Sequence, residues 1–259
     1  MKKDTVKTNI KTIAKELKLP YIGRNIEEEI KEANIKNLTY ETFLLSLLEN
    51  EYDLRKANGI KSRIRQARFP YKKYIEDLSL EDLPQDARDK IKVFSSLDFI
   101  ETGQNIILAG NPGTGKTHIA IGLGIKACNK GYKVLFTTIP LLVNELKESR
   151  SEKTLRAFEK KFEKYDLVIA DELGYISFDK EASELLFTYL SLRAGRKSTI
   201  ITTNLSFERW DEIFKDPVMT AAMIDRLTHK SYIVNINGNS YRLKETQLWL
   251  EKKYFFYPS

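Results

Sequence analysis

One eight-residue segment restricts the fold of this chain more than any other feature of the sequence. Residues 110–117 read Gly-Asn-Pro-Gly-Thr-Gly-Lys-Thr, which is the full pattern of a phosphate-binding loop. An apolar run at 105–109 precedes the loop, and a run with helical character at 116–129 follows it. This context predicts that the loop joins a buried strand of a parallel sheet to the N-terminus of a helix.

The loop predicts a site for ATP and Mg²⁺. Glycines let the backbone wrap around phosphates, so that N–H groups and the helix N-terminus face the negative charge. Lys116 is expected to reach the β- and γ-phosphates, and the Thr117 hydroxyl is expected to hold Mg²⁺. The predicted nucleotide-binding residues of the loop are Gly110, Asn111, Pro112, Gly113, Thr114, Gly115, Lys116 and Thr117.

The remaining sequence beyond Pro84 alternates short apolar runs with amphipathic segments, which is typical of an α/β fold with a parallel sheet between helices. The pattern predicts strands at 105–109, 133–138, 167–171, 199–203 and 232–236. Helices are expected at 116–129, 140–148, 155–164, 181–194 and 217–228. We therefore place an ATPase domain at 101–259, preceded by a linker and entry helix at 71–100.

The first 70 residues predict a small all-helical module that binds DNA or a partner. Apolar residues recur at helical spacing in 5–19, which Pro20 is expected to close, and further helices are expected at 25–33 and 39–57. Asn58-Gly59 is expected to interrupt the third helix, and the basic run at 60–67 is a further candidate helix.

Two strands end in polar residues that fit the chemistry of the loop. The apolar strand Leu-Val-Ile-Ala ends in Asp171-Glu172, and the strand at 199–203 ends at Asn204. Carboxyl ends of parallel strands meet at the ligand-binding edge of such sheets. We assign Asp171 to Mg²⁺, Glu172 to activation of the attacking water, and Asn204 to that water or to the γ-phosphate. For Asn204, a cap at the strand end is the structural alternative.

Arg226 follows Asp225 near the end of the 217–228 helix. An arginine at this position is a candidate to enter the site of a neighbouring subunit and stabilise charge in the transition state. A local ion pair with Asp225 is the alternative.

The basic charge of the chain is concentrated in one block. The whole chain has a net charge of +7, and residues 55–73 contain eight basic residues and no acidic one, which leaves the remainder near −1. Such a block is typical of a polyanion-binding surface, whereas a solvated helix face is the alternative. The predicted DNA-binding residues are Arg55, Lys56, Lys61, Arg63, Arg65, Arg68, Lys72 and Lys73.

The sequence also indicates where the protein works. Its first residues are charged, it has no long apolar run, and its single cysteine, Cys128, has no partner for a disulfide. We expect a cytoplasmic protein that does not interact with membranes.

Taken in order, these motifs resemble a known family. The loop, Asp171-Glu172, Asn204 and the segment Asp225-Arg226-Leu227-Thr228-His229 resemble the AAA+ class and, within it, the IstB and DnaC/DnaI branch. The segments 67–70 (Ala-Arg-Phe-Pro) and 237–244 (Asn-Gly-Asn-Ser-Tyr-Arg-Leu-Lys) resemble IstB-type helper ATPases of insertion sequences in particular. The resemblance implies an ATP-hydrolysing, Mg-dependent oligomer that binds duplex target DNA and recruits or stimulates a transposase.

The resemblance also assigns two arginines. It implies that Arg226 is an intersubunit finger and that Arg242 is a second nucleotide sensor. The chain ends soon after Arg242, so we expect no full helical lid.

Two other functions use the same nucleotide site. A DnaC/DnaI-like helicase loader is the main alternative, although this amino-terminal module has no cysteine and concentrates arginine instead. A small-molecule or nucleotide kinase is a minor alternative, because a kinase needs an acceptor pocket and usually a closing lid.

Overall fold

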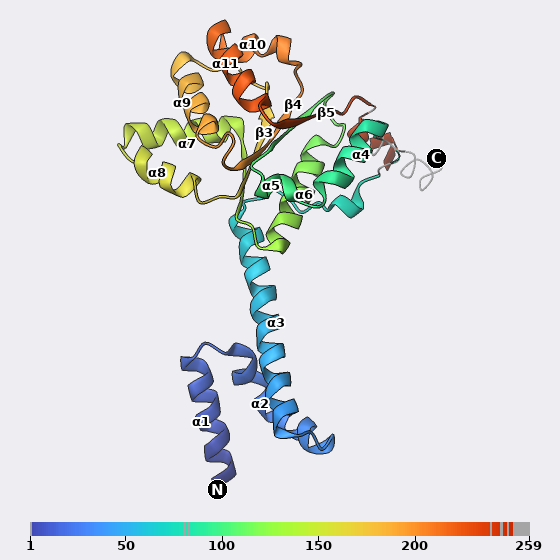
Figure 1. Ribbon diagram of the computed structural model, residues 1–259, viewed down its shortest axis with the longest axis vertical. Coiled ribbons are helices and arrows are strands. Elements are labelled where there is room, and N and C mark those ends of the chain that lie inside the picture. Colours follow the sequence, from blue (N-terminus) through green and yellow to red (C-terminus); the bar gives the residue numbers. More distant parts are fainter. Residues whose placement is uncertain are drawn as a thin grey trace, which may run out of the picture. The chain divides into compact units, whose positions relative to one another are not determined.

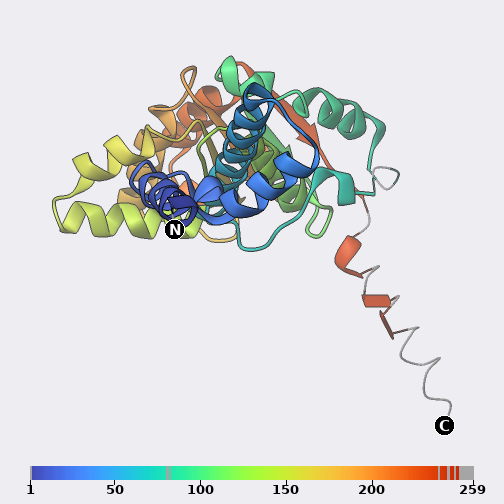
Figure 2. The ribbon, with the colours of Figure 1, turned by 90° about the horizontal axis from the view of Figure 1, so that it is seen from below.

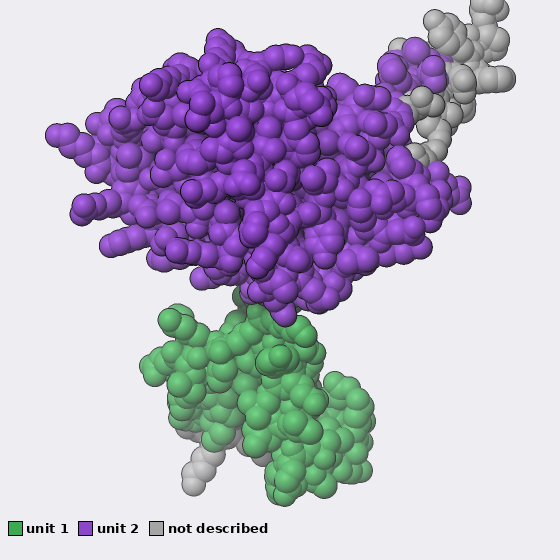
Figure 3. All heavy atoms as spheres, turned by 45° about the horizontal axis from the view of Figure 1, so that its top comes forward, with its two compact units in different colours: residues 1–62 green, residues 63–259 purple. Residues whose placement is uncertain are grey.

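The computed structural model describes residues 2–79, 81, 83–238, 240–243, 246–247 and 249–250, and for residues 2–4 it describes the backbone alone. The chain divides into two compact units, residues 1–62 and 63–259 (Figure 3). The division falls within one helix, eight residues before the boundary that the sequence suggested.

The first unit is helical throughout its described part. It contains α1 (Lys2–Glu16), α2 (Pro20–Ile35) and most of α3 (Tyr40–Gln66). Pro20 is the first residue of α2, where a missing N–H costs nothing, so α2 begins earlier than expected. The buried carboxylate of Glu51 accepts hydrogen bonds from the backbone N–H groups of Tyr21 and Ile22, and so caps α2 from α3.

Helix α3 corrects one expectation, because it continues through Asn58-Gly59 without interruption. A glycine in a helix interior costs about 1 kcal/mol relative to alanine. This cost is small in α3, because the helix extends cooperatively on both sides of Gly59 and its carboxyl-terminal end is held by packing. Ile64, near that end, packs against the core of the second unit.

The second unit is built on a five-stranded parallel sheet with the strand order β2-β3-β4-β1-β5 (Figure 1). The strands are β1 (Asn105–Ala109), β2 (Val134–Thr138), β3 (Leu167–Leu173), β4 (Ser198–Thr203) and β5 (Ser231–Asn235). The expected α/β fold with a parallel sheet is thereby confirmed, and β1 has the bounds that the sequence predicted.

Helices cover both faces of this sheet (Figure 1, Figure 2). Their bounds are α4 (Gln85–Phe94), α5 (Asp98–Glu101), α6 (Lys116–Lys130), α7 (Ile139–Ser151), α8 (Leu155–Phe162), α9 (Lys180–Ser191), α10 (Asp211–Phe214) and α11 (Pro217–Thr228), with short turns η1 (Ile75–Asp77) and η3 (Phe207–Arg209). Alternate strand residues enter two cores: Ile106 and Leu108 pack with α4 and α6, whereas Ile107 packs with α7, α9 and α11. No helix in the described part of the chain is long and apolar enough to span a membrane.

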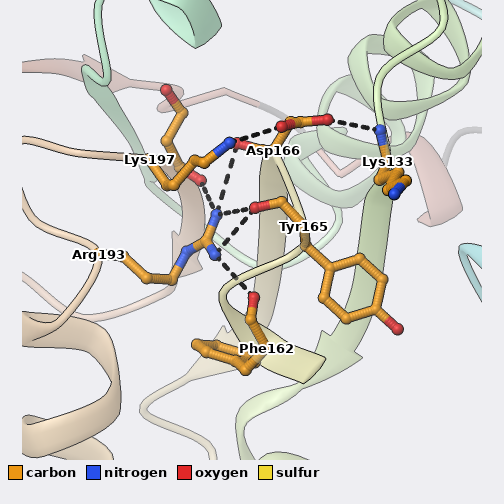
Figure 4. Close-up of polar contacts among 7 residues, drawn as sticks. Lys133, Phe162, Tyr165, Asp166, Arg193 and Lys197 are labelled. Carbon is orange, nitrogen blue, oxygen red and sulfur yellow. Dashed lines mark hydrogen bonds and ion pairs between the residues drawn. The ribbon is translucent and has the colours of Figure 1, made fainter. Parts of the chain in front are cut away.

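A buried arginine closes the edge of the sheet at which β3 and β4 begin (Figure 4). Arg193 is 2% exposed and donates to the backbone carbonyls of Phe162, Tyr165 and Ser198 at 2.9–3.2 Å. Burial lowers the pKa of Arg193 to about 10, so this guanidinium remains charged near neutral pH. Arg193 thereby satisfies buried carbonyl groups at the amino ends of β3 and β4, which is the end of the parallel sheet opposite the phosphate loop.

Candidate nucleotide site

The loop at 110–117 has the backbone of an anion cradle. Gly110, Gly113 and Gly115 have φ angles of +146°, +79° and +94°, in the region that only glycine adopts easily. A Cβ on Gly110 would lie 2.1 Å from the carbonyl oxygen of Ile236. Gly115 is the N-cap of α6, and no side chain caps that helix, so its first N–H groups face the loop.

Lys116 is folded back over the loop. Its Nζ donates to the carbonyl oxygens of Gly110 and Asn111, both at 2.7 Å. Burial lowers the pKa of Lys116 to about 8; Asp171 opposes this shift, and Arg242 adds to it. The ammonium group is thus held among backbone oxygens, beside the helix N-terminus.

Thr117 and Asp171 form the pair that the sequence predicted for a metal ion. The Thr117 hydroxyl lies 3.0 Å and 3.2 Å from the two carboxylate oxygens of Asp171, a buried residue of β3. Burial raises the pKa of Asp171, and hydrogen bonds from Thr202 and Thr117 act against this rise. A hydroxyl and a carboxylate oxygen at one point are donors that Mg²⁺ prefers, so these residues fit that ion.

Glu172 turns away from the strand at a β-bulge. The register of β3 against β4 shifts between Ala170 and Leu173, and Glu172 has a φ of +67°. A left-handed backbone is unfavourable for a residue with a side chain, and such strain concentrates at functional sites. Burial, followed by the charge of Asp171, raises the pKa of Glu172, as suits a proton acceptor.

Thr202 was missed by the sequence reasoning. It is 2% exposed; its hydroxyl donates to Asp171 Oδ1 at 2.5 Å and accepts from the Glu172 backbone N–H at 3.0 Å. Thr202 lies on β4, two residues before Asn204. The two-residue period of β-strands was therefore a signal that could have identified Thr202.

A cavity of about 170 Å³ brings most of the predicted residues together. The loop residues Pro112–Thr117 line it, and Glu172, Asn204 and Arg242 join them. Asn204 Oδ1 is buried and has no hydrogen-bond partner within the described part of the chain. An orphaned buried oxygen is uncommon and is consistent with a ligand or water at this point. Within the described part of the chain, Asn204 Oδ1 therefore does not form the strand-end cap that was the structural alternative.

The tail reaches this cavity from β5. The Tyr241 backbone N–H donates to the carbonyl of Gly113 at 2.9 Å, and the Tyr241 hydroxyl donates to Ser79 O at 2.7 Å. These contacts place Arg242 beside Lys116 and Asp171, whose pKa values it affects. Asn239 and Lys244 of the tail motif lie outside the described residues.

Arg226 is not part of this cavity. It is exposed on α11, with its guanidinium 5.6 Å from the ring centre of Phe187. No ion pair joins Arg226 to Asp225 in the described structure. Its side chain therefore serves neither its own nucleotide cavity nor the local pair that we considered.

The structure separates the eight basic residues into three groups. Three of them bind the protein itself: Arg55 donates to Lys18 O at 2.6 Å, Arg63 to Cys128 O at 2.9 Å, and Arg68 to Glu145 at 2.7 Å. Four are exposed without a hydrogen bond or ion pair in the described chain: Lys56, Lys61, Arg65 and Lys72. The eighth, Lys73, lines the nucleotide cavity.

Cys128, whose carbonyl Arg63 binds, is fully buried in α6 as a free thiol. Burial raises the pKa of the Cys128 thiol to about 11, so the side chain serves as an unreactive core residue.

The parallel sheet and the phosphate loop define a P-loop fold of the AAA+ type. The structure is similar to DnaA from Aquifex aeolicus bound to AMPPCP, with a TM-score of 0.55 and 19% identity over 71% of this chain and 56% of that one. It is also similar to a DnaI crystal structure, with a TM-score of 0.54 and 20% identity over 68% of this chain and 93% of that one.

Sequence comparison specifies the family. The model of the IstB-like ATP binding protein family matches residues 12–248, and the chain belongs to this family. The chain is 36% identical to an insertion sequence IS21 putative ATP-binding protein of Pseudomonas aeruginosa, over 91% of this chain and 89% of that protein. It is also 36% identical to an insertion sequence IS5376 putative ATP-binding protein of Geobacillus stearothermophilus, over 96% of this chain and 99% of that protein.

Proposed function

We propose that this protein is a magnesium-dependent ATPase that assists transposition by assembling on duplex target DNA and recruiting or stimulating a transposase. The observation that carries the proposal is the contact of Thr117 with Asp171 beside the phosphate loop, in a chain whose family includes insertion-sequence proteins. ATP binding is the property that the relatives' names state.

The residues of the cavity support a direct route for hydrolysis. Loop N–H groups and Lys116 hold the phosphates, and Mg²⁺ held by Thr117 and Asp171 offsets their negative charge when bound. Glu172 accepts a proton from water as the water oxygen bonds to the γ-phosphorus, and the bond from that phosphorus to the bridging oxygen breaks. The products are ADP and inorganic phosphate. Asn204 holds the water through its unpartnered Oδ1.

The position of Arg226 supports an ATP-dependent oligomer as part of this proposal. This arginine is exposed and lies outside its own cavity, so a neighbouring subunit's site is where it would meet a γ-phosphate. Completion of the site by a second copy makes hydrolysis depend on assembly.

The DNA contacts are assigned to the exposed cations of the basic block. Lys56, Lys61 and Arg65 lie on α3 and Lys72 follows it, none with a hydrogen bond or ion pair in the described chain. Free exposed cations are the groups that neutralise DNA phosphates. A helicase loader and a kinase remain the alternatives, and DNA preference distinguishes all three.

The test combines ATP turnover with DNA binding. We expect Lys116→Ala to lose ATP binding, and Glu172→Gln to keep binding but lose hydrolysis, because only the second substitution spares the phosphate contacts. Fluorescence anisotropy on random-sequence duplex and single strands, with ATP or ADP, should show tighter duplex binding with ATP. Preference for single strands would support a helicase loader, and the absence of DNA binding would favour a kinase.

A further inference from the structure

A strap of residues 67–75 connects α3 to η1 and lies directly on α6, the helix that begins at the phosphate loop. It is fixed at one end by a hydrogen bond from Phe136 N to Ala67 O at 2.7 Å. At the other end, Tyr74 O lies 2.8 Å from His118 Nε2, on the first turn of α6.

Two glycines of α6 make this close approach possible. A Cβ on Gly124 would lie 2.9 Å from the Phe69 ring, and one on Gly122 would lie 2.9 Å from the Ile75 backbone nitrogen. Glycine is unfavourable in a helix interior, so its presence at both crossing points fits a helix surface shaped to receive the strap.

Between its fixed ends, the strap places two residues at the nucleotide cavity. Tyr71 and Lys73 both line the cavity together with loop residues Gly113–Thr117. Tyr71 lies near the two acidic residues of β3, whose charges help to raise its pKa after the larger effect of burial. Lys72, which the strap carries between them, does not line the cavity.

We propose that Lys73 binds the phosphates of the nucleotide and is not one of the DNA contacts. This inference rests on the proposed nucleotide site and deepens it. Lys73 has no ion-pair partner in the described chain and lines the same small cavity as the phosphate loop. A cavity of about 170 Å³ admits a polyphosphate chain but no DNA duplex. Lysine binds phosphate as a point charge with three donors.

The experiment compares neighbouring lysines. Titration of a fluorescent ATP analogue with Mg²⁺ should give a Kd about tenfold higher for Lys73→Gln, the effect of one charge-assisted hydrogen bond. Lys72→Gln is the matched control and should bind like wild type, and Lys73→Arg should retain most of the affinity. Both lysines are exposed, so neither substitution should change the thermal unfolding midpoint.

Two outcomes overturn the inference, and Lys116→Ala distinguishes them. If Lys73→Gln binds like Lys72→Gln while Lys116→Ala has lost affinity, Lys73 is not a nucleotide contact and the proposed function stands. A duplex titration without nucleotide in which both glutamine variants lose equal affinity would then assign Lys73 to DNA. If Lys116→Ala also binds like wild type, the nucleotide site itself is wrong.

Discussion

The Thr202 hydroxyl donates a hydrogen bond to Asp171 Oδ1 at 2.5 Å. The Thr202 hydroxyl oxygen also accepts a hydrogen bond from the backbone N–H of Glu172, so one threonine orients both acidic residues of the site. Its role is to position the metal-binding carboxylate and the strained backbone of the proposed base.

Replacing Thr202 by valine should therefore slow ATP turnover. Valine keeps the shape but removes the donor to Asp171 and leaves the partly buried Glu172 N–H unpaired, at a cost of about 1–3 kcal/mol. We expect turnover to fall at least about tenfold with little change in ATP affinity. Thr202→Ser keeps the hydroxyl and is the control. Equal turnover in the valine and serine variants would show that this hydrogen bond does not matter for catalysis.

Arg226→Ala should leave ATP binding by one subunit intact while it strongly reduces hydrolysis. Finger arginines contribute about 10³ to 10⁵ in rate, and Arg226 lies outside the cavity of its own chain. Mixing Arg226→Ala with Glu172→Gln subunits should restore part of the activity, since each supplies what the other lacks. Arg196→Ala, at an exposed arginine before β4, is the control. Normal hydrolysis by Arg226→Ala alone would exclude the intersubunit role.

The structure indicates which basic residues a DNA-binding test should replace. Lys56, Lys61 and Arg65 are exposed, so replacing all three by alanine should weaken duplex binding and reduce the slope of log affinity against log salt by about two to three. Anisotropy over a salt series measures both quantities. An unchanged slope would identify the block as a solvated helix face.

Arg63 and Arg68 should respond differently to alanine substitution. Each binds the protein itself, at Cys128 O and Glu145, so their loss should lower the thermal unfolding midpoint and change the salt slope little. The partly buried Arg63 contact should matter more than the exposed Arg68 ion pair. A large loss of salt slope in either variant, with unchanged stability, would make it a DNA contact.

ATP binding should take up protons above neutral pH. Burial lowers the pKa of Lys116 to about 8, so the free protein loses this charge as pH rises through that value. Phosphates favour the charged form, and ATP affinity should therefore fall as pH rises above about 8. Calorimetry in two buffers of different ionisation enthalpy should show uptake at pH 8.5 and little at pH 7. The Lys116→Arg variant stays charged at these pH values. Proton uptake that persists in this variant would show that another titratable group takes up the proton.

The sequence determined the strands and the phosphate loop, because both depend on neighbours in the chain. An apolar run followed by closely spaced glycines specifies β1 and the loop within about a dozen residues, and α11 likewise has the predicted bounds. Asp171, Glu172 and Asn204 were brought to one edge by a general property of parallel sheets, namely that the carboxyl ends of the strands meet there.

Tertiary structure decided which residues of the basic block have partners within the protein. Arg63 and Arg68 are charged residues in a charged run, and their partners lie 65 and 77 residues away in the sequence. No local pattern distinguishes them from Lys61 or Arg65. Lys72 and Lys73 are adjacent and chemically identical, yet only Lys73 lines the cavity, because the path of the strap over the two glycines of α6 decides which residue lies there. Contacts between distant segments depend on how the sheet and helices pack, and a single sequence does not state that packing.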